Sequence, residues 1–296
     1  MEQLARSQGL ALRGNAPAAD SKAWINCLPS EHEPGFDFRF IEGSASAVSP
    51  DQQQDFVTGF HRDHASLNSW AATVGWTLPA VPDLQISVSE AYRISRALVP
   101  TWEGRVGWVE FPARRVIAGN AAILHELVHV YFPNGNRLLA EGFAIYLQDL
   151  IGGNPAFPNF GRPLHEVARA VLQEIVPGFG VGDVTALDQL HLVDLDGIAT
   201  PNPLTLEIGG HVLGEEARGQ GRLYPLAGSF VQFLIEEHGL SRFRELYACT
   251  PLMPPVLNGG TPARWLSAYG RPLTAFETEW KSLIAGSTAT KELDHA

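Results

Sequence analysis

The spacing of apolar residues predicts an N-terminal half that mixes short strands with one long helix. Apolar and polar residues alternate over residues 36–40 and again over 84–88, and a period of two indicates half-buried strands. Residues 105–111 predict a third strand. Ser49 and Pro50 can start a helix over about residues 51–74, where apolar residues recur at helical spacing. The members of this buried stripe are Phe56, Phe60, Leu67, Trp70 and Val74.

Two apolar helices are predicted in the middle of the chain. The first, around residues 121–130, is apolar on nearly every side, so we expect it to be buried. Pro133 cannot continue it, and the Asn-Gly pair that follows is a turn signal. Asn136 can then cap a second apolar helix over about residues 137–151. The short turn makes the two helices neighbours.

The remainder of the chain is predicted to be helical apart from one segment. Helices are expected over residues 163–176, from Tyr224 to about Gly239, and around Trp280. Residues 177–221 show no sustained period, and a long irregular segment of this kind is typical of a lid or wall beside a substrate.

These elements give an α+β fold in two lobes with terminal extensions. A small mixed sheet is expected in an N-terminal lobe, which ends with the first apolar helix, and a mainly helical C-terminal lobe follows, with the functional site in the cleft. Residues rich in Ala, Ser, Pro and Gly precede the first strand, and we expect them to be poorly ordered. The four predicted parts are the extension 1–34, the lobes 35–132 and 133–286, and the tail 287–296.

The first apolar helix carries His125 and His129 at positions i and i+4, one above the other on the same face. Two imidazoles in this arrangement can bind one metal ion, and the spacing suits zinc. Glu126 points about 100° away from His125, where a carboxylate can hold the water of a metal and act as general base. Either histidine alone could be a hydrogen-bonded core residue. The pair favours a metal, because an unpaired buried polar group costs roughly 2–7 kcal/mol.

Glu141, early in the second apolar helix, is the third ligand that we predict. A tight helical hairpin would bring its carboxylate back beside the histidines, so that the three side chains hold one zinc ion. Apolar neighbours make a solvated surface carboxylate the less favoured alternative. Gly142 costs about 1 kcal/mol relative to alanine in a helix interior. Close approach of the two helix backbones at the metal would offset this cost.

Other histidines are weaker candidates. His61 and His64 lie three residues apart in the long helix, but on a polar face beside Asp63, so a solvated surface is favoured over a metal pair. His191 and His211 lie in the irregular segment and could assist catalysis, although a loop histidine without such a role is the favoured alternative.

The segments HELVHVYF and LLAEGFAIYL together resemble the glutamate-zincin (gluzincin) metallopeptidases, in particular the peptidase-MA-like group, in which an EG-A-Y segment closely follows the histidine pair. The metzincin pattern is absent, because it needs a glycine at Phe132 and a histidine at Gly135. Eleven residues separate His129 from Glu141, whereas thermolysin-like and aminopeptidase-like members have a longer linker.

The resemblance implies a zincin-like fold and two further site features. In such enzymes an edge strand beside the metal pairs with the extended substrate, and Gly107, Trp108 and Val109 are the matching candidates; an ordinary paired strand is the alternative. A tyrosine at the start of a late helix donates its phenolic proton to the oxyanion. Tyr224 matches that position, with a core or capping tyrosine as the alternative.

Composition and charge exclude several classes of protein. The chain has 296 residues, of which 45% are hydrophobic, so it can bury a substantial core. Its net charge of −11 disfavours nucleic acid and anionic membranes as partners. Cys27 and Cys249 are too few for a disulfide framework. No signal peptide or membrane span is recognisable, so a cytoplasmic location is expected, although an export signal upstream of this start would change that.

The sequence therefore predicts a zinc-dependent metallopeptidase that hydrolyses peptide bonds with a metal-activated water, acting on a peptide or protein substrate. Two alternatives remain open. One is a non-catalytic, zinc-stabilised module of zincin fold that binds a peptide or protein. Glu126 speaks against it, because a structural zinc site needs no base. The other is a zinc hydrolase that acts on a non-peptide amide.

Overall fold

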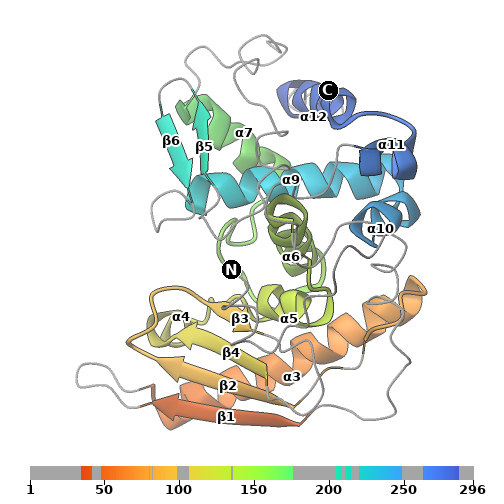
Figure 1. Cartoon of the computed structure of the whole chain (residues 1–296). Coiled ribbons are helices and arrows are strands. Elements are labelled where there is room, and N and C mark those ends of the chain that lie inside the picture. Colours follow the sequence, from red (N-terminus) through yellow and green to blue (C-terminus); the bar gives the residue numbers. More distant parts are fainter. Residues whose placement is uncertain are drawn as a thin grey trace, which may run out of the picture. The chain divides into compact units, whose positions relative to one another are not determined.

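The computed structural model shows a mixed α+β protein in which helices predominate (Figure 1). The chain divides into two units, one of residues 1–133 and 150–157 and the other of residues 134–149 and 158–296. The structure describes residues 35–41, 48–79, 81, 83–98, 107–134, 136–175, 205–208, 211–214, 220–248 and 263–286. The predicted extension 1–34 and tail 287–296 lie outside these residues. In the described part, no helix is both long enough and apolar enough to cross a lipid bilayer.

The first unit is built on a mixed sheet, as predicted, and this sheet has four strands. In space the order is β1-β2-β4-β3; β1, β2 and β4 run parallel, whereas β3 is antiparallel to β4 (Figure 1). β3 was not predicted, because three residues are too few to show a period of two. The strands are β1 (Phe36–Ile41), β2 (Leu84–Ser89), β3 (Arg96–Leu98) and β4 (Gly107–Pro112).

Helix α3 (Pro50–Thr73) provides the apolar layer against this sheet. It begins as predicted: the Ser49 hydroxyl accepts from the Gln52 N–H over 3.3 Å, and the Gln52 side chain accepts from the Ser49 N–H over 2.9 Å. Its aromatic residues pack on the strands, with ring centroids 5.4 Å apart for Phe60 and Phe38 of β1. α3 also contacts α5 (Ile123–Tyr131), the first of the two predicted apolar helices.

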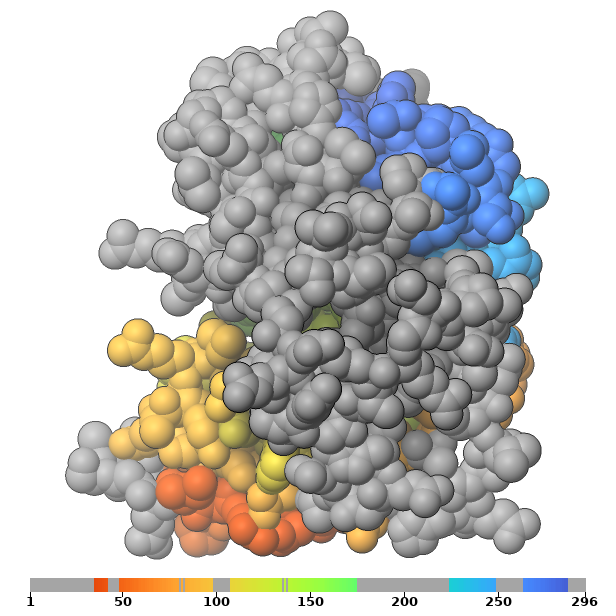
Figure 2. Space-filling model, viewed as in Figure 1, coloured from red at the N-terminus to blue at the C-terminus, as the bar shows by residue number. Residues whose placement is uncertain are grey.

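In the first unit, strand β1 is visible at the surface, where it is red in the space-filling view (Figure 2). The strand alternates as its sequence predicts: Phe36, Phe38 and Phe40 are partly covered, whereas the residues between them are exposed. Asp37 and Arg39 form an ion pair on the exposed side, with 2.8 Å between Oδ2 and Nη2. Such exposed pairs add little stability, so the strand is held chiefly by the ladder to β2 and by its phenylalanines.

The second unit is mainly helical, as predicted, but it also contains a β-hairpin within the segment that we expected to be irregular. The strands β5 (Thr205–Ile208) and β6 (His211–Gly214) are antiparallel. The helices are α6 (Arg137–Ile151), α7 (Leu164–Ile175), α9 (Gln220–His238), α10 (Leu240–Ala248), α11 (Ala263–Tyr269) and α12 (Leu273–Gly286). The last two residues of α6 belong to the first unit.

Two glycines let α6 and α9 approach each other closely. A Cβ added at Gly142 of α6 would lie 2.6 Å from the carbonyl oxygen of Ala227 and 2.5 Å from Cγ2 of Val231, both in α9. A Cβ at Gly228 of α9 would lie 2.5 Å from Cγ2 of Ile145 in α6. The close approach expected at Gly142 therefore exists, but our assignment of it to the histidine helix was wrong: α9 is the partner.

Gly142→Ala is expected to lower the free energy of unfolding by about 1–2 kcal/mol. The methyl group would overlap a backbone oxygen that cannot move aside, and overpacking of this kind costs about 1–3 kcal/mol, against a gain of up to about 1 kcal/mol from helix propensity. Urea titration followed by circular dichroism measures the change. Gly59→Ala in α3 is the matched control, because its Cβ would meet nothing closer than 3.5 Å. A neutral Gly142→Ala variant would contradict the packing argument.

A buried polar network joins three helices of the second unit. Trp280 Nε1 of α12 donates to the hydroxyl of Ser229 in α9 over 2.9 Å. The same hydroxyl lies 2.8 Å from Nδ1 of His165 in α7, to which it can donate. Burial lowers the pKa of His165. The network therefore favours the neutral imidazole, with Nδ1 as acceptor and the proton on Nε2.

This network predicts that stability falls in mild acid. Because the pKa of His165 is lowered in the folded chain, the unfolded chain binds the proton more readily, so the contribution is complete above the ordinary pKa of about 6.5 and is lost as the pH falls below it. Urea midpoints at pH 7.5 and pH 5.5 measure the loss. His165→Gln, which keeps an acceptor but does not titrate, should lose less than the wild-type chain; equal losses would exclude His165 as the cause.

Candidate metal site

Helix α5 places the two histidines as their spacing predicts. The Nε2 atoms of His125 and His129 lie 3.1 Å apart, and the ring centroids are 4.7 Å apart. α5 ends at Tyr131 with Phe132 as its C-cap, just before Pro133. Nearly all of its residues are buried, and His125 is only 7% exposed. The two histidines thus lie in a largely apolar helix with their Nε2 atoms close together.

The distance between the two nitrogens suits one shared ion. Two ligand nitrogens about 2.0–2.1 Å from zinc in tetrahedral geometry lie about 3.3 Å apart. The observed 3.1 Å is close to this separation. It also suits an N–H···N hydrogen bond in one tautomer. Only when both Nε2 atoms are deprotonated can both bind the same ion.

Helix α6 presents Glu141 to the same ion position. Asn136 caps α6 as predicted, because its Oδ1 accepts from the Leu139 N–H over 3.0 Å, and its side chain is completely buried. Glu141 is 3% exposed. His125, His129 and Glu141 each offer one ligand atom, and these atoms lie within 4.8 Å of one another. The three residues form a buried group that could hold a metal ion.

This group is distinctive within the described part of the chain, where no other cluster of three or more His, Cys, Asp or Glu residues has ligand atoms so close together. Glu126 is not a member of it, although it neighbours His125 in α5 and is 3% exposed. Glu126 thus adjoins His125 in the sequence without belonging to the group, as the general-base glutamate of an HExxH motif does.

A hydrogen bond between α5 and α3 was missed by sequence reasoning. The hydroxyl of Tyr131 lies 2.7 Å from Nε2 of His64, and the His64 ring centroid is 5.0 Å from that of Phe36. Our assignment of His64 and Asp63 to a solvated face was wrong, since Asp63 is fully buried and His64 is half-buried between helix and sheet. His61, one turn earlier, is exposed. Neither residue is marked as buried by its sequence context, because both stand among polar neighbours.

Strand β4 does not have the position that we predicted for it. Gly107, Trp108 and Val109 belong to β4, which lies between β2 and β3 and is not an edge strand. Trp108 and Val109 pair with Leu98 and Ala97 of β3 on one side and with β2 on the other. Their backbone groups are therefore engaged within the sheet. The edge strand on this side is β3, which also contacts α5.

Tyr224 lies in the second turn of α9, not at its start, because α9 already begins at Gln220. Pro225 consequently lies inside the helix, beyond its first turn. The Tyr224 side chain is buried, with 8% exposed. Of the two further histidines considered above, His191 lies outside the described residues, and His211 is the first residue of β6.

A second tyrosine lies near the proposed carboxylate ligand. Tyr247 of α10 is 1% exposed, and its ring centroid lies 5.4 Å from that of Phe143, two residues after Glu141. Burial raises the pKa of Tyr247, and the negative charge of Glu141 adds to this shift. Nothing in the sequence near Glu141 points to Tyr247, because the two are brought near each other by the packing of the Phe143 ring against the Tyr247 ring.

The comparisons add no family to this picture. No protein-family model matches the chain, and neither the curated proteins nor the solved structures contain a match. The chemistry of the buried group is therefore the basis on which a function can be argued.

Proposed function

We propose that this chain is a zinc-dependent peptidase of zincin-like fold, with one ion held by His125, His129 and Glu141. The observation that carries the proposal is the convergence of these three ligands beside Glu126 in a buried helix. Two neutral imidazoles and one carboxylate are a donor set that catalytic zinc sites use, with the fourth position left for water. A structural zinc site would fill that position with a fourth protein ligand.

The residues of the chain supply the remaining chemistry. Zinc in such a site lowers the pKa of its water to about 7 and polarises a carbonyl group. Glu126 would take a proton from the attacking water and deliver it to the leaving nitrogen. Tyr224 would donate a hydrogen bond to the oxyanion, by the resemblance described above. The buried setting of α5 strengthens each of these interactions, because little water competes for them.

The strand that we propose to pair with an extended substrate is β3, because β4 is not at an edge of the sheet. An extended peptide can add to the edge of a sheet through backbone hydrogen bonds. β3 is the edge strand next to β4, it contacts α5, and its three residues offer only a short ladder. Recognition through a short ladder depends on backbone groups and tolerates many side chains. We therefore propose a peptide or protein substrate with broad sequence tolerance at this strand.

Metal removal tests the proposed function. The chain is expected to carry one zinc ion by elemental analysis and to cleave a mixed-sequence peptide library detected by mass spectrometry. Treatment with 1,10-phenanthroline should reduce cleavage to background, and added Zn²⁺ should restore it. One bound zinc without cleavage of peptides would instead support a zinc-stabilised binding module, and cleavage of non-peptide amides alone would support an amide hydrolase. Absence of zinc at micromolar Zn²⁺ would contradict all three.

A further inference from the structure

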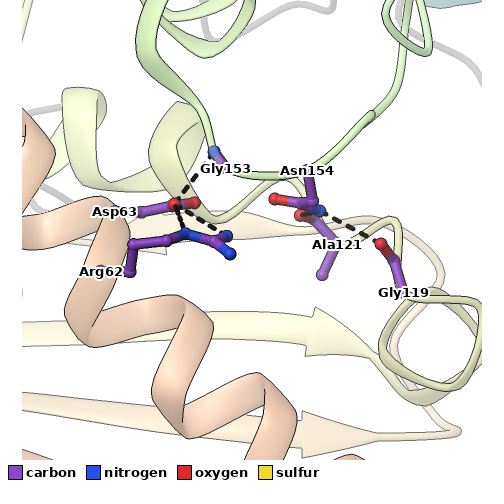
Figure 3. Close-up of polar contacts among 6 residues, drawn as sticks. All are labelled: Arg62, Asp63, Gly119, Ala121, Gly153 and Asn154. Carbon is purple, nitrogen blue, oxygen red and sulfur yellow. Dashed lines mark hydrogen bonds and ion pairs between the residues drawn. The ribbon is translucent and has the colours of Figure 1, made fainter.

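The loop that follows α6 is joined to two other segments of the first unit (Figure 3). The Gly153 N–H donates to Oδ1 of Asp63 in α3 over 3.1 Å. The next residue, Asn154, donates through Nδ2 to the carbonyl oxygen of Ala121 over 2.7 Å and to that of Gly119 over 3.4 Å. Gly153 and Asn154 therefore link α3 to the segment that leads into α5.

Asp63 is a costly residue to bury. Its side chain is fully buried, and Oδ1 also accepts from Nε and Nη2 of Arg62, each over 3.1 Å, while Arg62 itself is half-exposed. No donor among the described residues reaches Oδ2. Burial raises the pKa of Asp63, although Arg62 and the Gly153 N–H act in the opposite direction. Oδ1 of Asp63 therefore accepts both from Arg62 and from the Gly153 N–H, so one carboxylate oxygen connects α3 to the loop.

The loop passes directly over this ion pair. A Cβ added at Gly153 would overlap the guanidinium of Arg62. Glycine is thus needed for the Gly153 N–H to approach Asp63 while Arg62 remains in place. Three groups meet where the loop lies against α3: the carboxylate of Asp63, the guanidinium of Arg62 and the backbone of Gly153 (Figure 3).

The other end of the link lies at the start of the histidine helix. The carbonyl oxygen of Ala121 accepts from the N–H of Ile123, the first residue of α5, over 2.9 Å. The N-cap residue Ala122 makes no side-chain hydrogen bond. Asn154 therefore donates hydrogen bonds to the segment just before α5. Only two residues separate the N-cap residue Ala122 from His125.

We propose that Asp63 and Asn154 are positioning residues of the metal site. Through the loop after α6 they fix the end of the helix that carries Glu141 and the start of the helix that carries His125. The ligand atoms then meet one ion without rearrangement. This inference rests on the proposed metal-binding function and deepens it.

Zinc affinity measured on the full chain tests the proposal. Asp63→Ala removes the acceptor for Gly153, and Asn154→Asp turns two donors into a carboxylate facing two carbonyl oxygens. Competition with a chromophoric chelator should show the zinc Kd raised at least about tenfold in each variant, the range seen when groups that orient ligands are lost. The absorption spectrum of the Co²⁺ form should change as well. Asp63→Asn keeps an oxygen for Gly153 and should recover most of the affinity.

Leu67→Ala is the matched control. Leu67 is fully buried in α3, one turn after Asp63, and is outside the loop contacts. It should lower Tm but leave the zinc Kd of the folded chain within about twofold of wild type. Wild-type zinc affinity in Asp63→Ala and Asn154→Asp would overturn the positioning role. The role would also be overturned if these variants lost no more zinc affinity than Leu67→Ala does at a similar Tm. A wild-type chain that binds no zinc would instead overturn the proposed function itself.

Discussion

Glu126→Gln is expected to lower kcat for peptide hydrolysis by about 10²–10⁴-fold while one zinc ion stays bound. The amide has nearly the same volume as the carboxylate, so the buried packing around residue 126, which is 3% exposed, should persist. It cannot accept the proton of the attacking water, and loss of a general base costs a factor in this range. Steady-state kinetics on a cleaved library peptide, combined with elemental analysis of the same sample, measure both quantities.

Glu277→Gln is the control for loss of a buried carboxylate in general. Glu277 is 5% exposed in α12 and pairs with Lys281 one turn later. Its replacement should lower stability but leave kcat per zinc-loaded chain unchanged. Cleavage by Glu126→Gln at the wild-type rate would remove Glu126 from the role of base. Loss of zinc from that variant would instead indicate that Glu126 is a ligand.

The part of the site that could be predicted is the part encoded locally. The spacing of His125 and His129 fixes their shared face as soon as α5 forms, and Pro133 with Asn136 sets where one helix ends and the next begins. These signals act within a few residues, so the sequence alone brings Glu141 back toward the pair. The structure places the three ligand atoms within 4.8 Å of one another.

What could not be predicted depends on contacts between distant segments. β4 has the sequence of a regular strand, but whether it is central or at an edge depends on β3, whose three residues carry no pattern of their own. Asp63 stands between Arg62 and His64 and resembles a surface residue. It is buried because Gly153, 90 residues later in the chain, closes over it. Helical periodicity describes one helix at a time and cannot contain this information.

Gly142 shows the same limit within a correct inference. Its position in an apolar helix indicated a close approach of backbones, and that approach exists. The partner could not be identified, because both α5 and α9 are apolar helices that could supply it. α9 is the partner, so Glu141 is held by a helix crossing that is independent of the histidines. Glu141, the proposed carboxylate ligand, thus lies on a helix that packs closely against α9 within the second unit.

Glu141→Gln should therefore weaken zinc binding without disturbing this packing. The neutral amide is a poor zinc ligand, and we expect the zinc Kd to rise at least about 100-fold, more than for loss of a group that only orients a ligand. The crossing of α6 and α9 at Gly142 is untouched, so Tm measured without metal should stay near the wild-type value. Competition with a chelator gives the Kd, and activity should recover in part at high Zn²⁺ because Glu126 is still present.

Asp149→Asn separates the loss of a ligand from the loss of charge. Asp149 also lies in α6, where its carboxylate accepts from Asn159 and burial raises its pKa. It is not a member of the metal group. Both substitutions remove one carboxylate from the same helix, yet only Glu141→Gln should change the zinc Kd. Equal Kd values in the two variants and in wild type would show that the third ligand lies elsewhere, and an ion held by α5 and α6 together would no longer be tenable.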